Sequence, residues 1–415
     1  AFPEKNFVPV YWMATEDHDF EEIDHFHFRG ETLKWRTDQK GAVGRMDTQA
    51  LQQTYDDFSK LLQDYSSRAE KLKKLFSDSY LKHSNHADAF RVLVHSLFSE
   101  EGLVIVDGDD RKLKQEFAPI MEEELMEEKS LGLVSKVNEQ LSTNYKIQVN
   151  PREINLFYLQ DGLRERIIRE KDTYRINNTQ ISFSRDEILG KLKTEPESFS
   201  PNVLLRPLYQ ECILPNLAYI GGGGELAYWF QLRESFRHFK IPMPVLLLRN
   251  SAKWIYGKSF KRMQALNADV QQLFEEEEEW IKNDSCRNSE KDLDISEERN
   301  KVADAFKALS AKAAAMDTTL IDYVGAGKQR SMNHLEQLEK KIIRVQKRQN
   351  SERIRWISEL KENLFPAKGL QERYANFSNV FQDLGEEMFE LLYCTFDLPE
   401  EDFIVFVGER EETAM

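Results

Sequence analysis

FVPVYWMA, residues 7–14, is a short apolar run that ends abruptly in the charged segment TEDHDF, residues 15–20. Three further runs of this kind follow: GLVIVD (102–107), NLAYIGG (216–222) and PVLLLRN (244–250). Polar or helix-forming sequence comes after each of them. Short, fully apolar strands separated by helices are typical of a parallel sheet covered on both faces. The sequence therefore predicts a doubly wound α/β core.

The composition is that of an ordinary globular protein with an acidic surface. A length of 415 residues with 40% hydrophobic residues is enough for two or three packed domains. The net charge of −15 disfavours nucleic acid as a partner. The three cysteines lie far apart without CxxC spacing, which argues against disulfides and zinc and fits a cytoplasmic location. No apolar run approaches the ~18 residues that a membrane span needs, so we expect no membrane partner.

We expect the core to occupy residues 1–285 and to carry two insertions. Residues 48–76 keep apolar side chains at helical spacing, which predicts a long amphipathic helix within a helical crossover over about residues 45–85. Residues 145–195 contain alternating strands broken by Asn-Pro, Asp-Gly and Asn-Asn turns. This pattern predicts an antiparallel β insertion that forms a lid or subdomain.

Residues 286–362 are predicted to form an antiparallel coiled-coil hairpin, because their apolar residues advance by alternating steps of three and four. Gly325-Ala326-Gly327 is the expected point of reversal. Arms of this length are too long to be buried by the core, so we expect the hairpin to form a homodimer. Residues 363–415 contain a helix and a strand-like FIVFV segment (403–407), which we expect to return to the core.

In α/β sheets, ligands bind beyond the carboxyl ends of the strands, so the end of each predicted strand is a candidate site. The first strand ends in Asp17, His18 and Asp19. A histidine between two aspartates suits a general base or a clamp for ammonium and hydroxyl groups. The alternative is that the acids only cap the next helix. A metal site built from His18, His25 and His27 is disfavoured, because their spacing puts the rings on different faces.

The second candidate site lies in SFSPNVLLRPLYQE, residues 198–211. Asn202, Arg206 and Gln210 recur every four residues, which aligns them on one face wherever the segment is helical. Arg206 offers a bidentate fork for a carboxylate or phosphate. A surface salt bridge is the alternative interpretation.

The third candidate site is the glycine turn, in which Gly221, Gly222, Gly223 and Gly224 lie between a strand and a helix. Such a turn lets a ligand approach the backbone closely. Glu225 at the helix start would repel phosphate, so we expect the turn to bind an amino acid or sugar, with Glu225 meeting an ammonium or hydroxyl group. Tyr228 is included among these substrate-binding candidates. The alternative is a tight turn without a ligand.

The fourth candidate site is basic. Arg249, Lys258 and Lys261 follow the last predicted strand in an otherwise acidic chain, which predicts contacts to nucleotide phosphate. A solvated helix start is an equally good interpretation.

With these segments in view, the chain resembles the BshC family, the cysteine-adding enzymes of bacillithiol biosynthesis. The resemblance rests on PVYWMATEDHDFEEI, on PNVLLRPLYQECILPNLAYIGGGGELAYW and on LLLRNSAKWI with the basic segment after it. It implies a Rossmann-like core with connective insertions and a coiled-coil dimerisation domain. Members of the family also carry a segment ahead of the strand that here starts at Phe7. The resemblance therefore implies that Ala1 lies within the domain and that this chain is short at its N-terminus.

The resemblance further implies a ligase that joins cysteine to glucosaminyl-malate. It implies ATP as the source of activation, through an adenylate or an acyl phosphate, with Mg²⁺ only as the companion of the nucleotide. We expect Asp17, His18 and Asp19 to orient and deprotonate the amine, and Asn202 and Arg206 to hold the malate carboxylates. The competing hypotheses are a non-catalytic sugar- or nucleotide-binding scaffold and a metal-dependent hydrolase.

Overall fold

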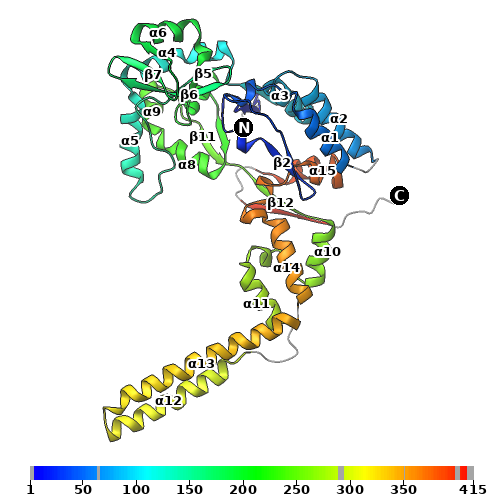
Figure 1. The fold of residues 1–415 in the computed structure, drawn as a ribbon, viewed down its shortest axis with the longest axis vertical. Helices are drawn as coiled ribbons and strands as arrows, with labels where there is room; N and C mark the ends of the chain where they lie inside the picture. Colours follow the sequence, from blue (N-terminus) through cyan, green and yellow to red (C-terminus); the bar gives the residue numbers. More distant parts are fainter. Residues whose placement is uncertain (1–3, 63–65, 288–293, 350, 398–401, 409–415) are drawn as a thin grey trace. The chain divides into compact units, whose positions relative to one another are not determined.

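The computed structural model describes residues 4–62, 66–287, 294–349, 351–397 and 402–408, which form two compact units (Figure 1). Unit 1 comprises the described residues within 1–251 and 375–403. Unit 2 comprises those within 252–374 and 404–415.

The four predicted strands form two parallel pairs in unit 1. β1 (Val10–Met13) pairs with β4 (Val104–Asp107), and β10 (Ala218–Gly221) pairs with β11 (Val245–Leu248). The parallel pairing confirms the prediction, but the described strands form two separate pairs where one sheet was expected. Within each pair the carboxyl ends lie together, so the segment that leaves β1 lies beside the one that leaves β4.

The crossover from β1 to β4 contains several helices, where a single long one was predicted over residues 48–76. α1 (Leu51–Leu61) is followed by Leu62, whose backbone is no longer helical, with φ −82° and ψ 45°. α2 (Ser67–Phe76) begins behind Ser66, whose side chain accepts a hydrogen bond from the backbone of Ala69. Apolar residues keep helical spacing in both helices, so the spacing alone could not predict that the segment forms two helices and not one. A π-helical turn (Ser77–Leu81) and α3 (His86–Phe98) complete the crossover.

An antiparallel hairpin that the sequence did not predict precedes these helices. It consists of β2 (His25–Phe28) and β3 (Glu31–Lys34). The rings of Phe26 and Phe28 lie 5.5 and 5.0 Å from the ring of Phe58 on α1. The hairpin is therefore held by aromatic packing against the helices.

The predicted antiparallel insertion is present as a five-stranded sheet. In spatial order its strands are β8 (Ser182–Ser184), β7 (Thr173–Ile176), β6 (Leu163–Glu170), β5 (Leu156–Gln160) and β9 (Phe199–Pro201). β5 and β6 are joined at the predicted Asp161-Gly162 turn, where Gly162 has φ +72°. β9 lies beyond the expected range of 145–195 and ties the insertion to the segment that carries Arg206.

Six helices pack with this sheet and with the β10–β11 pair to complete the core of unit 1. They are α4 (Arg111–Glu127), α5 (Lys129–Leu141), α6 (Arg185–Thr194), α7 (Arg206–Ile213), α8 (Gly223–Gln231) and α9 (Arg233–Phe239). One cluster of buried side chains includes Phe117 of α4, Tyr158 of β5 and Trp229 of α8. The insertion and the segment around β10 and β11 therefore share one hydrophobic core.

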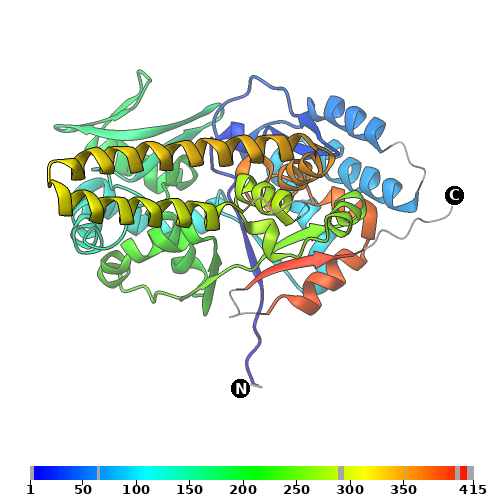
Figure 2. The ribbon, with the colours of Figure 1, turned by 90° about the horizontal axis from the view of Figure 1, so that it is seen from below.

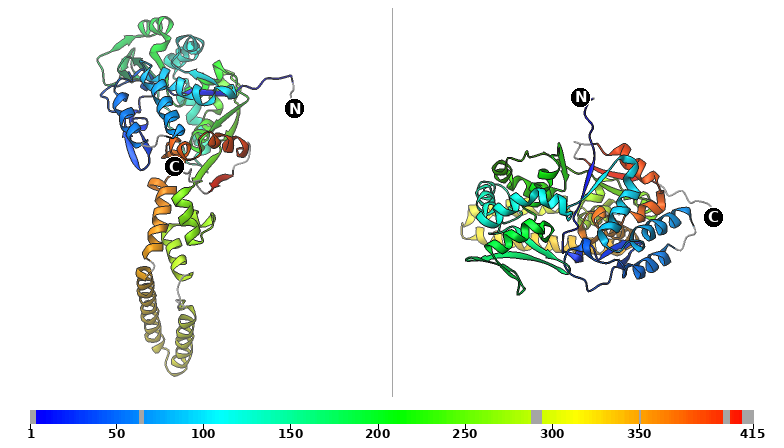
Figure 3. Two further views of the ribbon diagram at one scale, coloured as in Figure 1. Left: turned by 90° about the vertical axis from the view of Figure 1, so that its right-hand side faces the viewer. Right: turned by 90° about the horizontal axis from the view of Figure 1, so that it is seen from above.

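Unit 2 begins at residue 252, whereas we expected the core to extend to residue 285. β12 (Ser251–Ile255), α10 (Gly257–Leu266), α11 (Glu277–Arg287) and α14 (Ser351–Leu364) belong together because their apolar faces form one cluster, which includes Trp280 and Leu360 (Figure 3). β13 (Phe403–Val407) pairs with β12 and not with the parallel strands. α15 (Ser378–Leu384) and α16 (Glu387–Thr395) return to unit 1, as the tail was expected to do.

The helical hairpin is present, but its reversal was predicted at the wrong place. α12 (Ser296–Met316) and α13 (Leu320–Gln349) lie side by side and are joined at Asp317–Thr319 (Figure 2). Gly325 and Gly327 lie inside α13. A Cβ on Gly327 would come within 3.3 Å of the Phe306 ring on α12, so this glycine permits close packing of the arms. None of the described helices is long and apolar enough to cross a membrane.

Gly41 provides a test of how the insertion is attached to unit 1. Gly41 has φ +88°, and a Cβ there would lie 2.6 Å from the backbone nitrogen of Leu163. Gly30 has a similar φ of +83° with nothing within 4 Å. We expect Gly30→Ala to cost about 1–2 kcal/mol of unfolding free energy through backbone strain alone, and Gly41→Ala to cost clearly more.

Urea unfolding followed by circular dichroism measures both losses. Equal losses for the two variants would contradict the close approach of residue 41 to the β5–β6 turn.

Candidate functional site

The residues that follow β1 and β4 form an acidic cluster held together by hydrogen bonds. Met13 lies opposite Asp107 in the parallel pair, so Thr15 reaches the Asp107 carboxylate with its hydroxyl. The carbonyl of Thr15 accepts a hydrogen bond of 2.8 Å from the backbone of Gly44. A Cβ on Gly44 would lie 2.5 Å from the Cβ of Thr15, so only glycine fits there.

Glu16 is buried and forms an ion pair with a lysine from α4. The ammonium of Lys114 is fully buried and donates to the Glu16 carboxylate and to the carbonyl of Phe199. Burial raises the pKa of Glu16, against the opposing attraction of Lys114. The pair joins the end of β1 to α4 and β9.

The aspartates after β4 are also paired with cations. Arg45 forms a bidentate pair with Asp109 at 2.7 and 2.8 Å. Arg91 on α3 donates to Asp107 at 3.5 Å and to the carbonyl of Ile105 at 3.1 Å. These carboxylates are therefore structural ion-pair partners.

His18 lies against the antiparallel insertion. Its ring is 5.6 Å from the ring of Phe157 on β5, and its Nδ1 is 2.7 Å from the Nη1 of Arg164 on β6. Asp17 accepts hydrogen bonds from the backbone of His18 at 2.7 Å and of Asp19 at 3.4 Å. Asp17, His18 and Asp19, the predicted catalytic residues, thus form a turn. The Asp17 carboxylate accepts from the backbone of this turn, and the side chains of His18 and Asp19 are exposed.

Arg206 lies at the start of α7 among phenols and an amide. Its guanidinium donates to Gln210 at 3.1 Å, to the Tyr219 hydroxyl at 3.3 Å and to the Tyr228 hydroxyl at 3.4 Å. Within the part of the chain that the structure describes, no carboxylate lies within ion-pair distance of this guanidinium. Because the hydrogen-bond partners of Arg206 are neutral, its positive charge is not neutralised by a carboxylate of the protein, and it is suited to bind an anionic ligand.

Asn202 was predicted to share a helix face with Arg206, but it lies ahead of α7. Its side-chain oxygen accepts from the backbone of Leu204 at 2.9 Å, and its amide nitrogen donates to Asn155 at 2.9 Å. Because both ends of the amide are engaged, Asn202 shapes the turn that leads into α7.

The glycine turn lies beside Arg206, because Tyr219 contacts both. The Tyr219 hydroxyl lies 3.3 Å from Glu225, which also accepts from the backbone of Gly222 at 2.8 Å. Burial raises the pKa of Tyr219, and nearby Arg206 opposes that shift. Glu225 therefore caps its own helix, while Gly223 and Gly224 have open space where a side chain would lie.

The basic residues are divided between the two units. Arg249 in unit 1 donates from its backbone to the carbonyl of Gly221 at 3.0 Å, so it lies beside the glycine turn. Lys258 and Lys261 are exposed on α10 in unit 2, where they line a shallow surface hollow with Arg355 and Trp356.

Tyr209 connects α7 to the acidic cluster. Its hydroxyl donates to the carbonyl of Gly108 at 2.8 Å, and its ring meets Trp12 of β1 edge-on at 5.2 Å. The helix that carries Arg206 is thereby anchored on the ends of β1 and β4. The sequence did not predict this contact of Tyr209, nor the contacts of Lys114, Arg45 and Arg164. Each of these four residues lies far along the chain from the residue that it contacts.

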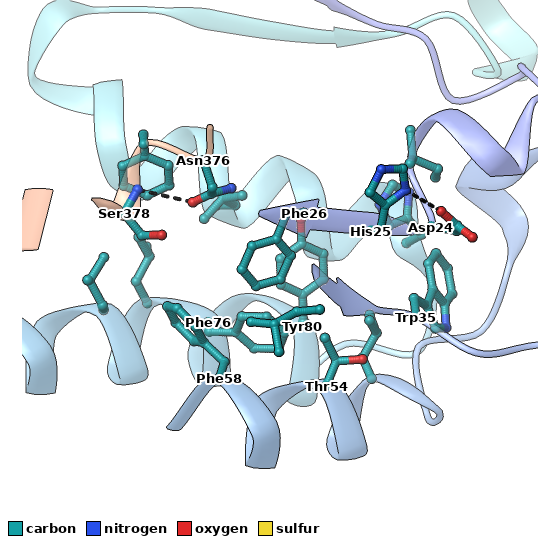
Figure 4. Close-up of a pocket in the computed structure, with 18 residues that line it drawn as sticks. Asp24, His25, Phe26, Trp35, Thr54, Phe58, Phe76, Tyr80, Asn376 and Ser378 are labelled. Atoms are coloured by element: carbon teal, nitrogen blue, oxygen red, sulfur yellow. Dashed lines mark hydrogen bonds and ion pairs between the residues drawn. The ribbon is translucent and has the colours of Figure 1, made fainter. Parts of the chain in front are cut away.

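Unit 1 also contains an apolar cavity of about 120 Å³ (Figure 4). Phe58, Phe76 and Tyr80 crowd its centre, and the Asp24–His25 pair lies at one side. Burial lowers the pKa of His86, which also lines it, to about 4. None of the predicted site residues lines this cavity, and its aromatic walls do not suit phosphate.

Comparison with known proteins identifies two family models along the chain. Residues 1–250 match "Bacillithiol biosynthesis BshC, N-terminal Rossmann-like domain", and residues 252–407 match "Bacillithiol biosynthesis BshC, C-terminal coiled-coil domain". The boundary between these models, at residues 250–252, coincides with the point where unit 2 begins, whereas residues 375–403, which the second model also covers, belong to unit 1.

Several similar proteins carry the printed name "Putative cysteine ligase BshC". The protein from Flavobacterium psychrophilum is 49% identical over 387 residues, which cover 93% of this chain and 72% of the relative. The protein from Flavobacterium johnsoniae is 46% identical over 391 residues, covering 94% and 74%. The protein from Christiangramia forsetii is 42% identical over 415 residues, covering 99% and 77%.

The Glu16–Lys114 pair predicts a pH-dependent loss of stability. Lys114→Met leaves Glu16 buried without its partner, so we expect a loss of about 3–5 kcal/mol of unfolding free energy near neutral pH. Because burial raises the pKa of Glu16, folding opposes its ionisation, and the loss should be smaller near pH 5 than near pH 8. Denaturant unfolding at both pH values measures this.

The matched control is Lys112→Met on the exposed side of the same helix, which should change stability little. The double variant Glu16→Gln/Lys114→Met should recover much of the loss. A double variant as unstable as Lys114→Met alone would show that the lysine does not act through Glu16.

Proposed function

Given that the chain belongs to the BshC family, we propose that it is a cysteine ligase of bacillithiol biosynthesis. The reaction joins the carboxyl group of cysteine to the amine of glucosaminyl-malate through an amide bond. The observation that carries the proposal is Arg206, a guanidinium surrounded by neutral partners beside an open glycine turn. Such a group recognises a carboxylate, and glucosaminyl-malate carries two.

Arg206 and Gln210 hold the malate carboxylates in this proposal, with the Tyr228 hydroxyl beside them. Of the glycine turn, Gly221 and Gly222 are buried beside Tyr219 and Glu225, and the exposed backbone at Gly223 is where a ligand can approach closely. Asn202 supports Arg206 from the preceding turn. The hydroxyls of Tyr219 and Tyr228 fix the plane of the guanidinium, which favours two-pronged binding.

The segment Asp17–Asp19 receives the amine. The carboxylate of Asp19 is exposed and accepts no hydrogen bond from any described residue. It is therefore available to bind the ammonium form of the substrate and to accept the proton that the ammonium group loses. Asp17 is engaged by the backbone of the turn and by Arg164, whose Nη1 lies 3.4 Å from its Oδ1.

ATP supplies the activation of the cysteine carboxyl group. Arg249 lies beside the glycine turn, and Lys258 and Lys261 add exposed positive charge around the hollow in unit 2. Arginine and lysine side chains suit phosphate oxygens, so the segment at Arg249 and the hollow at Lys258 and Lys261 are two separate candidates for phosphate binding. A homodimer formed by the α12–α13 hairpin is also proposed, because Leu309, Leu338 and Val345 are about half exposed on it, at 51%, 46% and 51%.

Incubation of the protein with glucosaminyl-malate, cysteine and ATP tests the ligase proposal. Mass spectrometry should detect the cysteinyl product, and release of AMP or of ADP will identify the adenylate or acyl-phosphate route. Binding of glucosaminyl-malate without turnover would instead support the non-catalytic scaffold.

Arg206→Met provides the test of substrate recognition. Loss of a charged hydrogen-bond donor costs about 1.5–3 kcal/mol, so we expect KM for glucosaminyl-malate to rise roughly ten- to a hundredfold. KM for cysteine should change little. Arg233→Met, an exposed arginine on α9, is the control and should leave both constants unchanged. An equal rise in both KM values would show that Arg206 does not select the malate group.

A further inference from the structure

The histidine at the end of β1 has a defined hydrogen-bonding state. The Nδ1 of His18 lies 2.7 Å from the Nη1 of Arg164, within ordinary hydrogen-bond distance. A guanidinium can only donate hydrogen bonds, so Nδ1 must be the acceptor. In a neutral imidazole that accepts at Nδ1, the proton lies on Nε2. The ring therefore offers a donor, not a free basic nitrogen, to whatever approaches Nε2.

Arg164 is held firmly enough to impose this state. Its side chain is only 9% exposed, and its guanidinium lies over the ring of Phe157 at 4.1 Å. Its Nε donates to the hydroxyl of Ser200 at 3.2 Å. The same Phe157 ring contacts His18, so one aromatic side chain supports both members of the pair.

Carboxylates surround the His18–Arg164 pair, and one of them contacts the ring directly: the Oδ1 of Asp17 lies 3.4 Å from the Nδ1 of His18. Burial lowers the pKa of Arg164, while Glu16, Asp17 and Asp19 act in the opposite direction. Arg164 thus remains the cation that these carboxylates face. The Nδ1 of His18 is closer to the Nη1 of Arg164, at 2.7 Å, than to the Oδ1 of Asp17, at 3.4 Å, so the shorter contact, in which Nδ1 accepts, sets the role of this nitrogen.

We propose that Arg164 is a positioning residue that keeps the His18 proton on Nε2, so that His18 donates a hydrogen bond to an anionic oxygen of the reacting carboxyl group and does not act as the base. This inference rests on the proposed function for its catalytic meaning. It assigns to the antiparallel insertion, which carries Arg164 and Phe157, a direct part in the site. It also leaves Asp19 as the acceptor of the amine proton.

The position of the proton can be read without turnover. Long-range ¹H–¹⁵N spectra of the histidine-labelled chain distinguish the two neutral tautomers and the charged ring, and His18→Gln identifies the His18 signals by their loss. We expect the neutral Nε2–H form near pH 7.5. A signal of the Nδ1–H tautomer, or of the charged ring, would overturn the proposal in the unmodified protein, with no variant required.

Two arginine variants on one strand test the cause. Arg164→Met should shift His18 towards a mixture of tautomers. Arg169→Met, which removes another β6 arginine that lies over a tyrosine ring, should leave the His18 spectrum unchanged. An unchanged spectrum in folded Arg164→Met would show that Arg164 does not set the tautomer.

The rate of the ligase reaction tests the role of the donor. Gln at position 18 can present an amide N–H near the place of Nε2–H but cannot take up a proton. We expect His18→Gln to stay within about tenfold of the parent kcat and His18→Ala to lose about 10²-fold or more. Equal losses of that size in both variants would indicate a base and overturn the assignment.

The two readouts separate this inference from the proposed function. A chain that shows no ligase activity but has His18 as the Nε2–H tautomer, dependent on Arg164, would refute the proposed function and retain the positioning role. An active ligase with the other tautomer would refute the positioning role alone.

Discussion

Charge neutralisation at the ends of two adjacent strands is the constraint on which unit 1 depends. Parallel pairing of β1 with β4 brings Glu16, Asp17, Asp107 and Asp109 together, and such carboxylates cannot share a partly buried space without cations. Each cation comes from a different element: Lys114 from α4, Arg164, which contacts Asp17, from β6, Arg91 from α3 and Arg45 from a 3₁₀ turn. The acidic cluster therefore determines which elements must gather around it.

This arrangement separates residues that build the site from those that remain available to a ligand. Asp107, Asp109 and Glu16 have partners, and Asn202 and Glu225 are engaged with their own turns. By contrast, Arg206 has only neutral hydrogen-bond partners, and the Asp19 carboxylate accepts no hydrogen bond from a described residue. These two side chains are therefore the groups on which the proposed substrate contacts depend.

The features that sequence predicted are those encoded locally. The strand runs are short, apolar and sharply bounded, and the Asp161-Gly162 turn has the residue types that a hairpin requires. The break at Leu62 was not predictable from apolar spacing, which continues through it. The reversal of the long hairpin was misplaced because glycine suits a turn and a close helix contact equally well. The cations that pair with the acidic cluster, such as Lys114 and Arg45, were not predicted, because nothing in the sequence near them indicates which distant carboxylate they contact. Arg249 and Lys258 were grouped because they are close in sequence, yet the boundary between the units falls between them.

The close approach of Phe306 to Gly327 limits how the length of the α12–α13 hairpin can change in this chain. A ring on one arm of the α12–α13 hairpin meets a residue without a side chain on the other, so the two arms have a fixed registry. Inserting residues between this contact and the Asp317–Thr319 bend in one arm only would displace one partner along its helix. Keeping this contact while changing the length of the hairpin in this chain would therefore require matched changes, most simply one heptad gained or lost in both arms together.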